Sequence, residues 1–299
     1  MSATAPGRTQ VPLRPRKPPP SDGVRAARFV FGRIFYYVGS VLFATFFLLP
    51  LLWLTVAPFS TLANLSFQLP DPWSLQNFAR VFENTFAIRA LVQNSVLQAA
   101  GGMLLVTVCA TLAAYALSRA AIRGTEAITY GLVLFSSVVT GTAAMVPIFL
   151  MIFRMGLIDT HLGVILVFTG GLLPAAIFIM RDFVDSIPRS YEESAMVAGA
   201  SSWAVFRDVA LPIVRPGMMV VGVWAFVNVW GGFLIPFILL RSSEKMPAAV
   251  AIYSFYTEAG TPLVTLTAAY SVLYTLPVLL LYLFVNWKYG FRFFGGIKS

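Results

Sequence analysis

Charged side chains are scarce in this sequence. Only 11% of the 299 residues are Asp, Glu, Lys or Arg, whereas 58% are hydrophobic. A typical soluble domain has about a quarter of its residues charged. The composition therefore excludes an ordinary soluble domain and predicts a protein that lies in a lipid bilayer.

Residues that bind metals or form cross-links are also few. The sequence has one histidine, His161, and one cysteine, Cys109, which are too few ligands for a closed structural zinc site. A single cysteine also excludes an internal disulfide. No segment matches Gly-x-x-x-x-Gly-Lys-Ser/Thr, the loop with which many proteins hold the phosphates of ATP. We therefore expect no metal site, no cofactor bound by this chain and no ATP hydrolysis by it.

Acidic side chains are missing from the apolar parts of the sequence. All twelve Asp and Glu residues lie between the apolar runs or at their ends, whereas carriers driven by an ion gradient hold such groups inside the membrane. A self-powered carrier is therefore disfavoured, although broken helices can bind sodium through backbone carbonyls alone. An intramembrane enzyme would need a catalytic pair within the runs, and the runs contain none.

Six long apolar runs are the main feature that is present. Each approaches the ~20 residues of a membrane-spanning helix, and none alternates apolar and polar residues as the strands of a membrane barrel do. The runs lie at Phe35–Phe59, Ala90–Leu117, Ile128–Phe153, Leu162–Met180, Met218–Leu240 and Leu263–Trp287. We predict an all-α integral membrane protein whose six transmembrane helices form one domain over residues 33–299.

The basic residues are divided unevenly between the two sides of such a bundle. With the N-terminus inside, 16 of the 21 Lys and Arg residues lie on the inner side, as the positive-inside rule expects. Both termini are therefore predicted to be cytoplasmic, and the net charge of +9 does not indicate nucleic acid. Residues 1–32 are rich in proline and arginine and are predicted to be a disordered basic cytoplasmic tail.

The longest polar stretch between the runs is residues 188–217, which we place on the cytoplasmic side. Ser190 and Glu193 have the spacing of a capping box, so we predict that a helix begins at Tyr191. Gly199 is expected to end this helix, because glycine readily takes the left-handed conformation that follows a helix.

A second short helix is predicted after the glycine. Ser201 or Ser202 can cap it, Trp203 and Phe206 fall on one of its faces, and Pro212 is expected to stop it. Residues 188–217 are then either two helices that meet a soluble partner or an interfacial hairpin that only closes the bundle.

The sequence of this polar stretch resembles that of a known loop. The residues Glu192-Glu-Ser-Ala-Met-Val-Ala-Gly-Ala200, followed by Leu211-Pro212, resemble the EAA loop of permease subunits in binding-protein-dependent ABC importers. Further segments are similar to MalG-like carbohydrate permeases: Asn94-Ser95, Ala113-Ala-Tyr-Ala-Leu-Ser-Arg119, Val146-Pro-Ile-Phe-Leu, Gly156-Leu-Ile-Asp-Thr160 and Gly295-Gly-Ile-Lys298. The resemblance covers roughly residues 35–299.

The resemblance implies a transport subunit in the prokaryotic plasma membrane. It forms half of the translocation pathway for a sugar, an oligosaccharide or a glycerol-phosphate-like solute. The implied partners are a homologous second permease, two ATPase subunits that bind ATP and Mg, and an extracytoplasmic solute-binding protein. An importer of a non-carbohydrate solute is the alternative, and a channel or scaffold without an energy source is a third reading.

In this family the EAA loop docks in a cleft of the ATPase. We expect Glu193 to orient the docking helix, Trp203 and Phe206 to support it, and Gly199 to allow close approach. The full set of expected coupling residues is Glu192, Glu193, Ala195, Gly199, Trp203, Phe206, Leu211 and Pro212.

The sequence departs from the family pattern in two places. The Asp that often precedes the loop glycine is Ala198 here, and the common Trp-Asn-Glu/Asp-Phe run is Trp230-Gly231-Gly232-Phe233. The paired glycines either widen the substrate cavity or allow close helix packing. The residues expected along the substrate pathway are Trp224, Asn228, Trp230, Gly231 and Gly232.

Aromatic residues are concentrated in the last outer loop. Tyr253, Phe255 and Tyr256 lie beside Glu258, and either they contact the solute-binding protein or they belong to an aromatic belt at the membrane surface.

Overall fold

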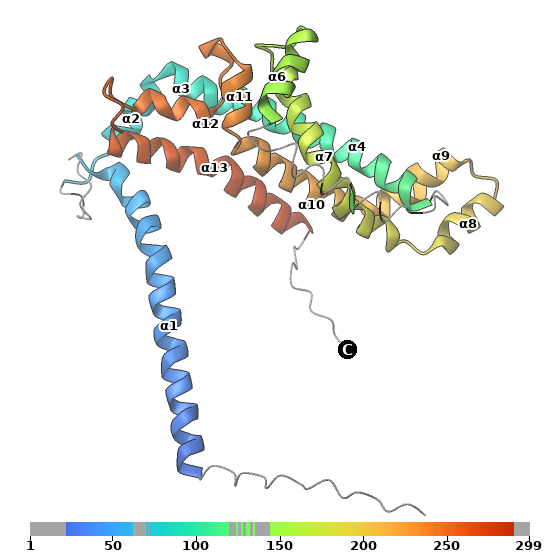
Figure 1. Cartoon of the computed structure of the whole chain (residues 1–299), viewed down its shortest axis with the longest axis horizontal. Helices are drawn as coiled ribbons and strands as arrows, with labels where there is room; N and C mark the ends of the chain where they lie inside the picture. Colours follow the sequence, from blue (N-terminus) through green and yellow to red (C-terminus); the bar gives the residue numbers. More distant parts are fainter. Residues whose placement is uncertain are drawn as a thin grey trace, which may run out of the picture. The chain divides into compact units, whose positions relative to one another are not determined.

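The computed structural model describes residues 22–61, 70, 72–119 and 144–289, with 124, 127, 130, 131 and 134 between them (Figure 1). These residues form helices and turns, with one isolated antiparallel bridge between Tyr256 and Pro262. Five segments are helical, long and apolar enough to cross a bilayer: Phe31–Phe59, Thr85–Arg119, His161–Asp185, Ser202–Trp230 and Val264–Lys288. The predicted helical membrane fold is confirmed.

The count of six spanning helices stays a prediction. Most of the third apolar run, Ile128–Phe153, lies outside the described residues. Its C-terminal part is α6 (Met145–Arg154), an apolar helix of 10 residues.

The chain divides into two units, Met1–Trp53 and Leu54–Ser299. The first contains almost all of α1 (Asp22–Val56), whose side chains are exposed from Phe31 to Leu52 and whose apolar part is long enough to cross a bilayer. The helix begins at Asp22, so residues 22–32 of the predicted disordered tail are helical. The prolines that favoured disorder end at Pro20, and Ala26 and Ala27 favour a helix after them. Residues 1–21 lie outside the described residues.

The second unit is built around three contacting helices, α4 (Val96–Arg119), α7 (His161–Asp185) and α10 (Leu211–Trp230). Small residues allow their close approach. A Cβ atom added at Gly102 would lie 2.8 Å from Cγ2 of Val229, and one at Gly217 would lie 2.4 Å from the ring of Phe183.

Shorter helices surround this centre. They are η1 (Ala57–Phe59), α2 (Gln76–Glu83), α3 (Thr85–Arg89), a π-helical turn η2 (Ala90–Ser95), α11 (Leu234–Leu239), η5 (Ser243–Lys245), α12 (Ala248–Ala251) and η6 (Ile252–Phe255). The last long helix, α13 (Val264–Tyr289), packs against α2 and η1. Its Tyr270 is fully buried and donates a hydrogen bond from its hydroxyl to the carbonyl of Ala87 at 3.3 Å.

The fifth spanning helix differs from the predicted Met218–Leu240. It starts earlier, because α9 (Ser202–Val205) continues through a π-helical turn, η4 (Phe206–Ala210), into α10. The predicted stop at Pro212 is therefore wrong. The N–H of Leu211 bonds to the carbonyl of Phe206, and this wider turn just before Pro212 lets the helix continue through a residue that has no N–H.

The same helix also ends earlier than predicted. It stops at Trp230, and the chain passes through Gly231 and Gly232 before α11 begins at Leu234. Figure 1 shows α8 (Arg189–Val197) and α9 together at one end of α4, and α3 and α12 at the other. These two ends of the second unit are called the α8 end and the α12 end below.

Candidate functional site

The helix at the centre of the candidate site, α8, starts differently from the prediction. It begins at Arg189 after Pro188, which is extended, and no side chain caps it. Ser190 lies inside the helix, where its carbonyl accepts a hydrogen bond from the hydroxyl of Ser194 at 2.7 Å. The predicted capping box is wrong because the proline already sets the extended conformation that precedes a helix.

The end of α8 is as predicted. Gly199 has a φ of +91°, in the left-handed region. Its N–H bonds to the carbonyl of Met196, and the N–H of Ala200 bonds to that of Ala195, each at 3.0 Å. This pair of bonds is the Schellman motif. Ser201 then caps α9 by accepting a bond from the N–H of Ala204 at 3.3 Å, which confirms the predicted second helix start.

A buried ion pair joins α8 to the end of α4. Nε of Arg119 donates to Oε1 and Oε2 of Glu192 at 3.0 and 2.8 Å, and Nη2 donates to Oε1 at 2.8 Å. The side chains of Arg119 and Glu192 are only 17% and 7% exposed. Tyr115 adds a longer bond from its hydroxyl to Oε2 at 3.5 Å. Glu193, which we expected to orient the helix, is exposed, and Glu192 makes these contacts instead.

Aromatic rings connect α9 to Tyr115 near the end of α4. The ring of Phe206 is buried and lies 4.9 Å from that of Tyr115, and Trp203 lies 5.4 Å from Phe206 on the outer side. Trp203 itself is 63% exposed. Of the other expected coupling residues, Ala195 and Leu211 are half-buried and Pro212 is exposed. The structure thus brings the expected set to one end of the second unit.

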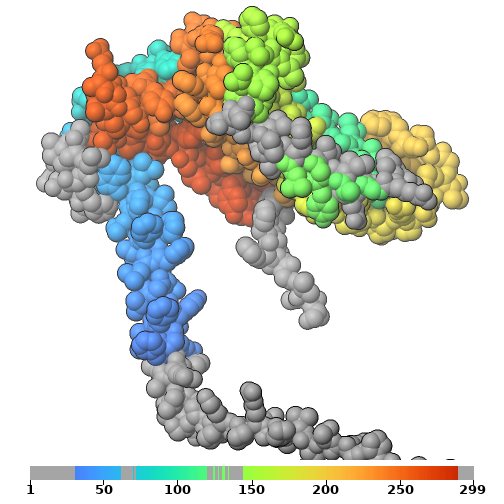
Figure 2. Space-filling model, viewed as in Figure 1, coloured from blue at the N-terminus to red at the C-terminus, as the bar shows by residue number. Residues whose placement is uncertain are grey.

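Sequence reasoning missed three apolar residues of α8 that the structure exposes. They are Tyr191, Met196 and Val197, of which Val197 is 90% exposed. Their presence in an otherwise polar stretch was the available signal. Sequence reasoning also missed Arg119 as the partner of Glu192, although an arginine at the end of an apolar run needs an acceptor for its hydrogen bonds. Figure 2 shows α8 and α9, in yellow, as a projecting end of the second unit.

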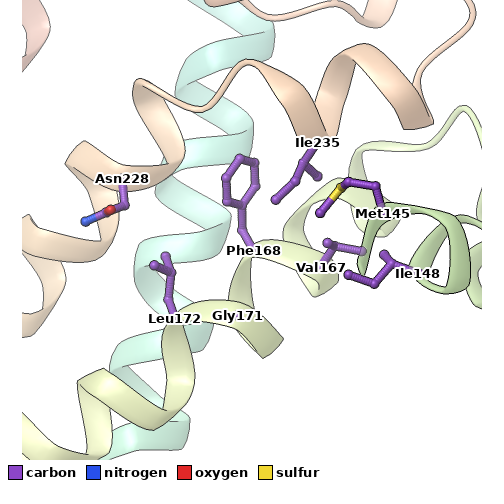
Figure 3. Close-up of a pocket in the computed structure, with 8 residues that line it drawn as sticks. All are labelled: Met145, Ile148, Val167, Phe168, Gly171, Leu172, Asn228 and Ile235. Atoms are coloured by element: carbon purple, nitrogen blue, oxygen red, sulfur yellow. The ribbon is translucent and has the colours of Figure 1, made fainter. Parts of the chain in front are cut away.

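The expected substrate-pathway residues have separate environments. Asn228 is exposed, and its amide donates to the carbonyl of Trp224 at 2.8 Å. It lines a cavity of about 220 Å³ (Figure 3) with Met145, Ile148, Val167, Phe168, Gly171, Leu172 and Ile235. With Trp224 it also lines a second hollow of about 500 Å³, whose other walls are Ile179, Val220, Val223, Val227, Tyr282 and Val285.

Trp230 does not line either cavity. Its ring is buried between Phe226 and Tyr274, at centroid distances of 5.4 and 5.5 Å. Its Nε1 donates to the carbonyl of Tyr274 at 3.1 Å, and the hydroxyl of Tyr274 donates to the carbonyl of Trp230 at 2.6 Å. These reciprocal bonds tie α10 to α13.

The two glycines after Trp230 differ from each other. A Cβ atom at Gly232 would lie 2.2 Å from Cζ of Phe168, so this glycine makes room for a ring that lines the smaller cavity. A Cβ atom at Gly231 would meet only the carbonyl of Val227, at 3.4 Å. Of the two alternatives predicted for the glycine pair, Gly232 fits close packing, whereas Gly231 is exposed.

The aromatic residues near the α12 end also divide. Tyr253 is exposed and Tyr256 half-buried, with their rings 5.1 Å apart. Phe255 is buried against Tyr270. Glu258 is exposed in the turn between Tyr256 and Pro262, and Figure 2 shows this orange-red turn projecting from the surface.

A polar network centred on Asp159 lies at the α12 end, and sequence reasoning did not find it. Asp159 has a φ of +56°, and its carboxylate accepts the hydroxyl of Ser242 at 2.5 Å and the N–H groups of Ser242 and Arg241 at 2.9 Å each. Nζ of Lys245 lies 3.1 Å from the same carboxylate. These donors, first the Ser242 hydroxyl, hold the pKa of Asp159 far below its usual range.

The N-terminal part of the second span extends this network. The amide of Asn94 donates to the carbonyls of Glu244 and Met246 at 2.7 and 2.9 Å, and Ser95 accepts the N–H of Ala248 at 2.7 Å. The helix that ends at Arg119 is therefore also fixed at its other end.

Similarity to known proteins gives the family. Residues 107–290 match the family described as binding-protein-dependent transport system inner membrane component. The maltodextrin transport system permease protein MdxG of Bacillus subtilis is 28% identical over 256 residues, 85% of this chain and 91% of that protein. The diacetylchitobiose uptake system permease protein NgcG of Streptomyces coelicolor is 30% identical over 247 residues, 81% of each.

A solved structure has the same fold. It is described as a bacterial ABC transporter involved in the import of the acidic polysaccharide alginate, and one of its chains superposes with a TM-score of 0.74 at 23% identity, covering 93% of this chain and all of that one. The family match spans more than half of the sequence, and the chain therefore belongs to the inner membrane components of binding-protein-dependent transport systems.

Proposed function

We propose that this chain forms half of the translocation pathway of an ABC importer for a carbohydrate. The relatives support this class, since MdxG is named as a permease of a maltodextrin transport system and NgcG as a permease of a diacetylchitobiose uptake system. A sugar, an oligosaccharide or a glycerol-phosphate-like solute fits the proposal.

The observation that carries the coupling role is the exposed apolar surface of the α8 end. Tyr191, Met196, Val197 and Trp203 point away from the bundle on a segment that is otherwise polar. Apolar side chains gathered on a projecting polar end mark a protein interface. The proposed partner is an ATPase subunit, which binds the ATP and Mg that this chain does not bind.

Energetics favour such a surface over a charged contact. An ATPase that switches the pathway from mostly inward-facing to mostly outward-facing must bind the two states with affinities that differ by about 5.5 kcal/mol. An exposed ion pair contributes roughly 0–1 kcal/mol, whereas a buried aromatic anchor contributes ~2 kcal/mol or more. Trp203 is the anchor that α9 offers, with Phe206 supporting it from below.

The rest of the complex is proposed by analogy with the family. The partners are a homologous second permease, two ATPase subunits and an extracytoplasmic solute-binding protein, all in or at a prokaryotic plasma membrane. We also propose that the α8 end and both termini lie in the cytoplasm, the orientation that puts 16 of the 21 Lys and Arg residues on the inner side.

The solute side of the proposal rests on two places. Asn228 and Trp224 are the pathway residues of this chain that line hollows, and an amide next to an aromatic ring suits a sugar hydroxyl and ring face. Tyr253, Tyr256 and Glu258 are accessible for contact with the binding protein, whereas the buried Phe255 holds their segment in place.

Reconstitution tests the proposal. The chain is purified with the second permease and the ATPase, placed in vesicles, and ATP hydrolysis and uptake of labelled oligosaccharides are measured with and without the loaded binding protein. We expect both activities to require the binding protein and a carbohydrate. Uptake without ATP would indicate a channel, and stimulation only by other solutes would remove the carbohydrate assignment.

A further inference from the structure

The docking helix α8 contacts α9 and η4, and one of its side chains is buried against the ends of the spanning helices. Of its nine residues, Glu192 alone is buried. The other eight are exposed or half-buried, so they provide few contacts that could carry force from this helix into the membrane. The side-chain link from α8 to α4 therefore runs through the groups that hold the carboxylate of Glu192.

The groups that hold the carboxylate, Arg119 and Tyr115, belong to α4, and Arg119 in turn contacts α7. Arg119, the last residue of α4, donates to both oxygens of the carboxylate. Its Nη2 also reaches the carbonyls of Val184 and Ile187, at 3.3 and 3.5 Å, which lie at the end of α7. One guanidinium thus joins α4, α7 and α8.

A second set of contacts reinforces the joint. Nη1 of Arg119 donates to the hydroxyl of Ser118 at 3.0 Å, and that hydroxyl donates to the carboxylate of Asp185. Asp185 in turn lies 3.3 Å from Nε of Arg181, one turn earlier on α7. The end of α4 and the end of α7 are therefore connected on both sides of the guanidinium.

The ion pair is internal. Both oxygens of Glu192 are engaged by Arg119, so this carboxylate is occupied within the chain, whereas Glu193 beside it is exposed. The two adjacent glutamates thus have different surroundings, one facing the bundle and one facing away from it.

We propose that Arg119 and Glu192 are positioning residues that make α8 and the adjoining ends of α4 and α7 one mechanical unit. Displacement of α8 by the ATPase then moves α4 and α7 with it. The inference rests on the proposed function of α8 as the docking helix, and it adds the link by which that motion enters the membrane.

The test uses the whole complex in vesicles and measures solute taken up per ATP hydrolysed. Arg119→Ala and Glu192→Gln are each expected to retain the bound ATPase but to lower this ratio at least tenfold. Arg119→Lys, which keeps the positive charge and the ability to donate to both the carboxylate and the carbonyls, is expected to retain at least half of the wild-type ratio. The matched control is R207Q with D208N, which removes an exposed ion pair of 2.7 Å near the same end and is expected to leave the ratio unchanged.

A covalent link gives an independent measurement. With Cys109→Ala as the background, R119C and E192C are bridged by a short bis-maleimide. We expect the unbridged protein to be uncoupled and the bridge to restore coupling, because the proposal requires α4 and α8 to move together throughout the cycle.

Several results would overturn the proposal. These are an unchanged ratio in assembled single variants, a bridge that blocks uptake, or a Glu192→Gln chain that cannot assemble although the control pair can, since that would show a role in folding only. Failure of the docking assignment is a separate result, because the wild-type chain would then not bind the ATPase at all.

Discussion

Gly231 and Gly232 are adjacent in the sequence, but the structure gives them different tolerances for a side chain. Gly232→Ala places a methyl group where the ring of Phe168 lies. We expect the ring to be displaced and the free energy of unfolding to fall by about 1–3 kcal/mol, the usual cost of overpacking. The thermal unfolding midpoint in detergent measures this change.

Gly231→Ala is the matched control, because its added Cβ meets only one backbone oxygen, at 3.4 Å, and the residue has a φ of −79°. The free energy of unfolding of this variant is expected to differ from that of the wild type by no more than about 0.5 kcal/mol, as for an ordinary surface substitution. Equal midpoints for the two variants would show that Phe168 does not need the space at Gly232.

Asp159 gives a prediction on pH. Its pKa is lowered in the folded protein by the groups that donate to it, so its contribution to stability is complete above the unfolded pKa of about 3.9 and is lost as the pH falls toward the folded pKa. Asp159→Asn keeps a residue that tolerates positive φ but removes the charge. We expect it to cost about 1–3 kcal/mol at pH 7.

The pH dependence separates this charge from others. The stability difference between wild type and Asp159→Asn should be constant from pH 8 to about 5 and should shrink as the pH falls below about 4. Glu244→Gln removes a neighbouring carboxylate that is mostly exposed. In this background the loss of the Asp159 contribution below about pH 4 should be the same as in the wild type. A difference that grows at low pH would contradict the assignment.

At the scale of elements, the end of α8 depends on Gly199. An L-residue in its left-handed conformation costs about 1–2 kcal/mol, and a charge there also faces the docking partner. Gly199→Asp and Glu193→Lys are both expected to leave the complex inserted but to uncouple ATP hydrolysis from uptake. Uptake and hydrolysis are measured together in vesicles.

The control for backbone strain is Gly156→Ala, which puts the same kind of residue at a φ of +69° near the α12 end. It is expected to lower the unfolding midpoint without changing the ratio of uptake to hydrolysis. Normal uptake in Gly199→Asp would remove the coupling assignment of α8.

Elements with local signals were predictable from the sequence. Gly199 and Ser201 act within a few residues of themselves, so the end of α8 and the start of α9 were correct. The start of α8 was not, because two signals competed there and Pro188 prevailed over Ser190. Pro212 was misread because the π-helical turn before it depends on the continuation of the whole helix.

The candidate site was predictable in position but not in its contacts. The EAA-like residues identified the stretch that gathers at the α8 end. Arg119 and Glu192, however, are 73 residues apart in the sequence, and nothing local indicates which of two adjacent glutamates faces inward. The burial of Trp230 was hidden in the same way, since its partner Tyr274 belongs to another spanning helix.

At the scale of the molecule, the orientation can be tested directly. In a Cys109→Ala background, Ala198→Cys marks the α8 end and Glu258→Cys marks the turn near the α12 end, and both positions are exposed. A membrane-impermeant maleimide added to intact spheroplasts is expected to label residue 258 only. Residue 198 should react only after permeabilisation, and the reverse pattern would invert the proposed topology.

The second span has a length that bears on the surroundings of the joint at Arg119. Its 35 residues, Thr85–Arg119, are about 52 Å long at 1.5 Å per residue, whereas the hydrocarbon layer of a bilayer is about 30 Å thick. Tilt alone accommodates only part of such an excess. Arg119 and Asn94 therefore lie toward the two headgroup layers, near opposite ends of the span, and a small change in bilayer thickness is not expected to disturb the network at either end.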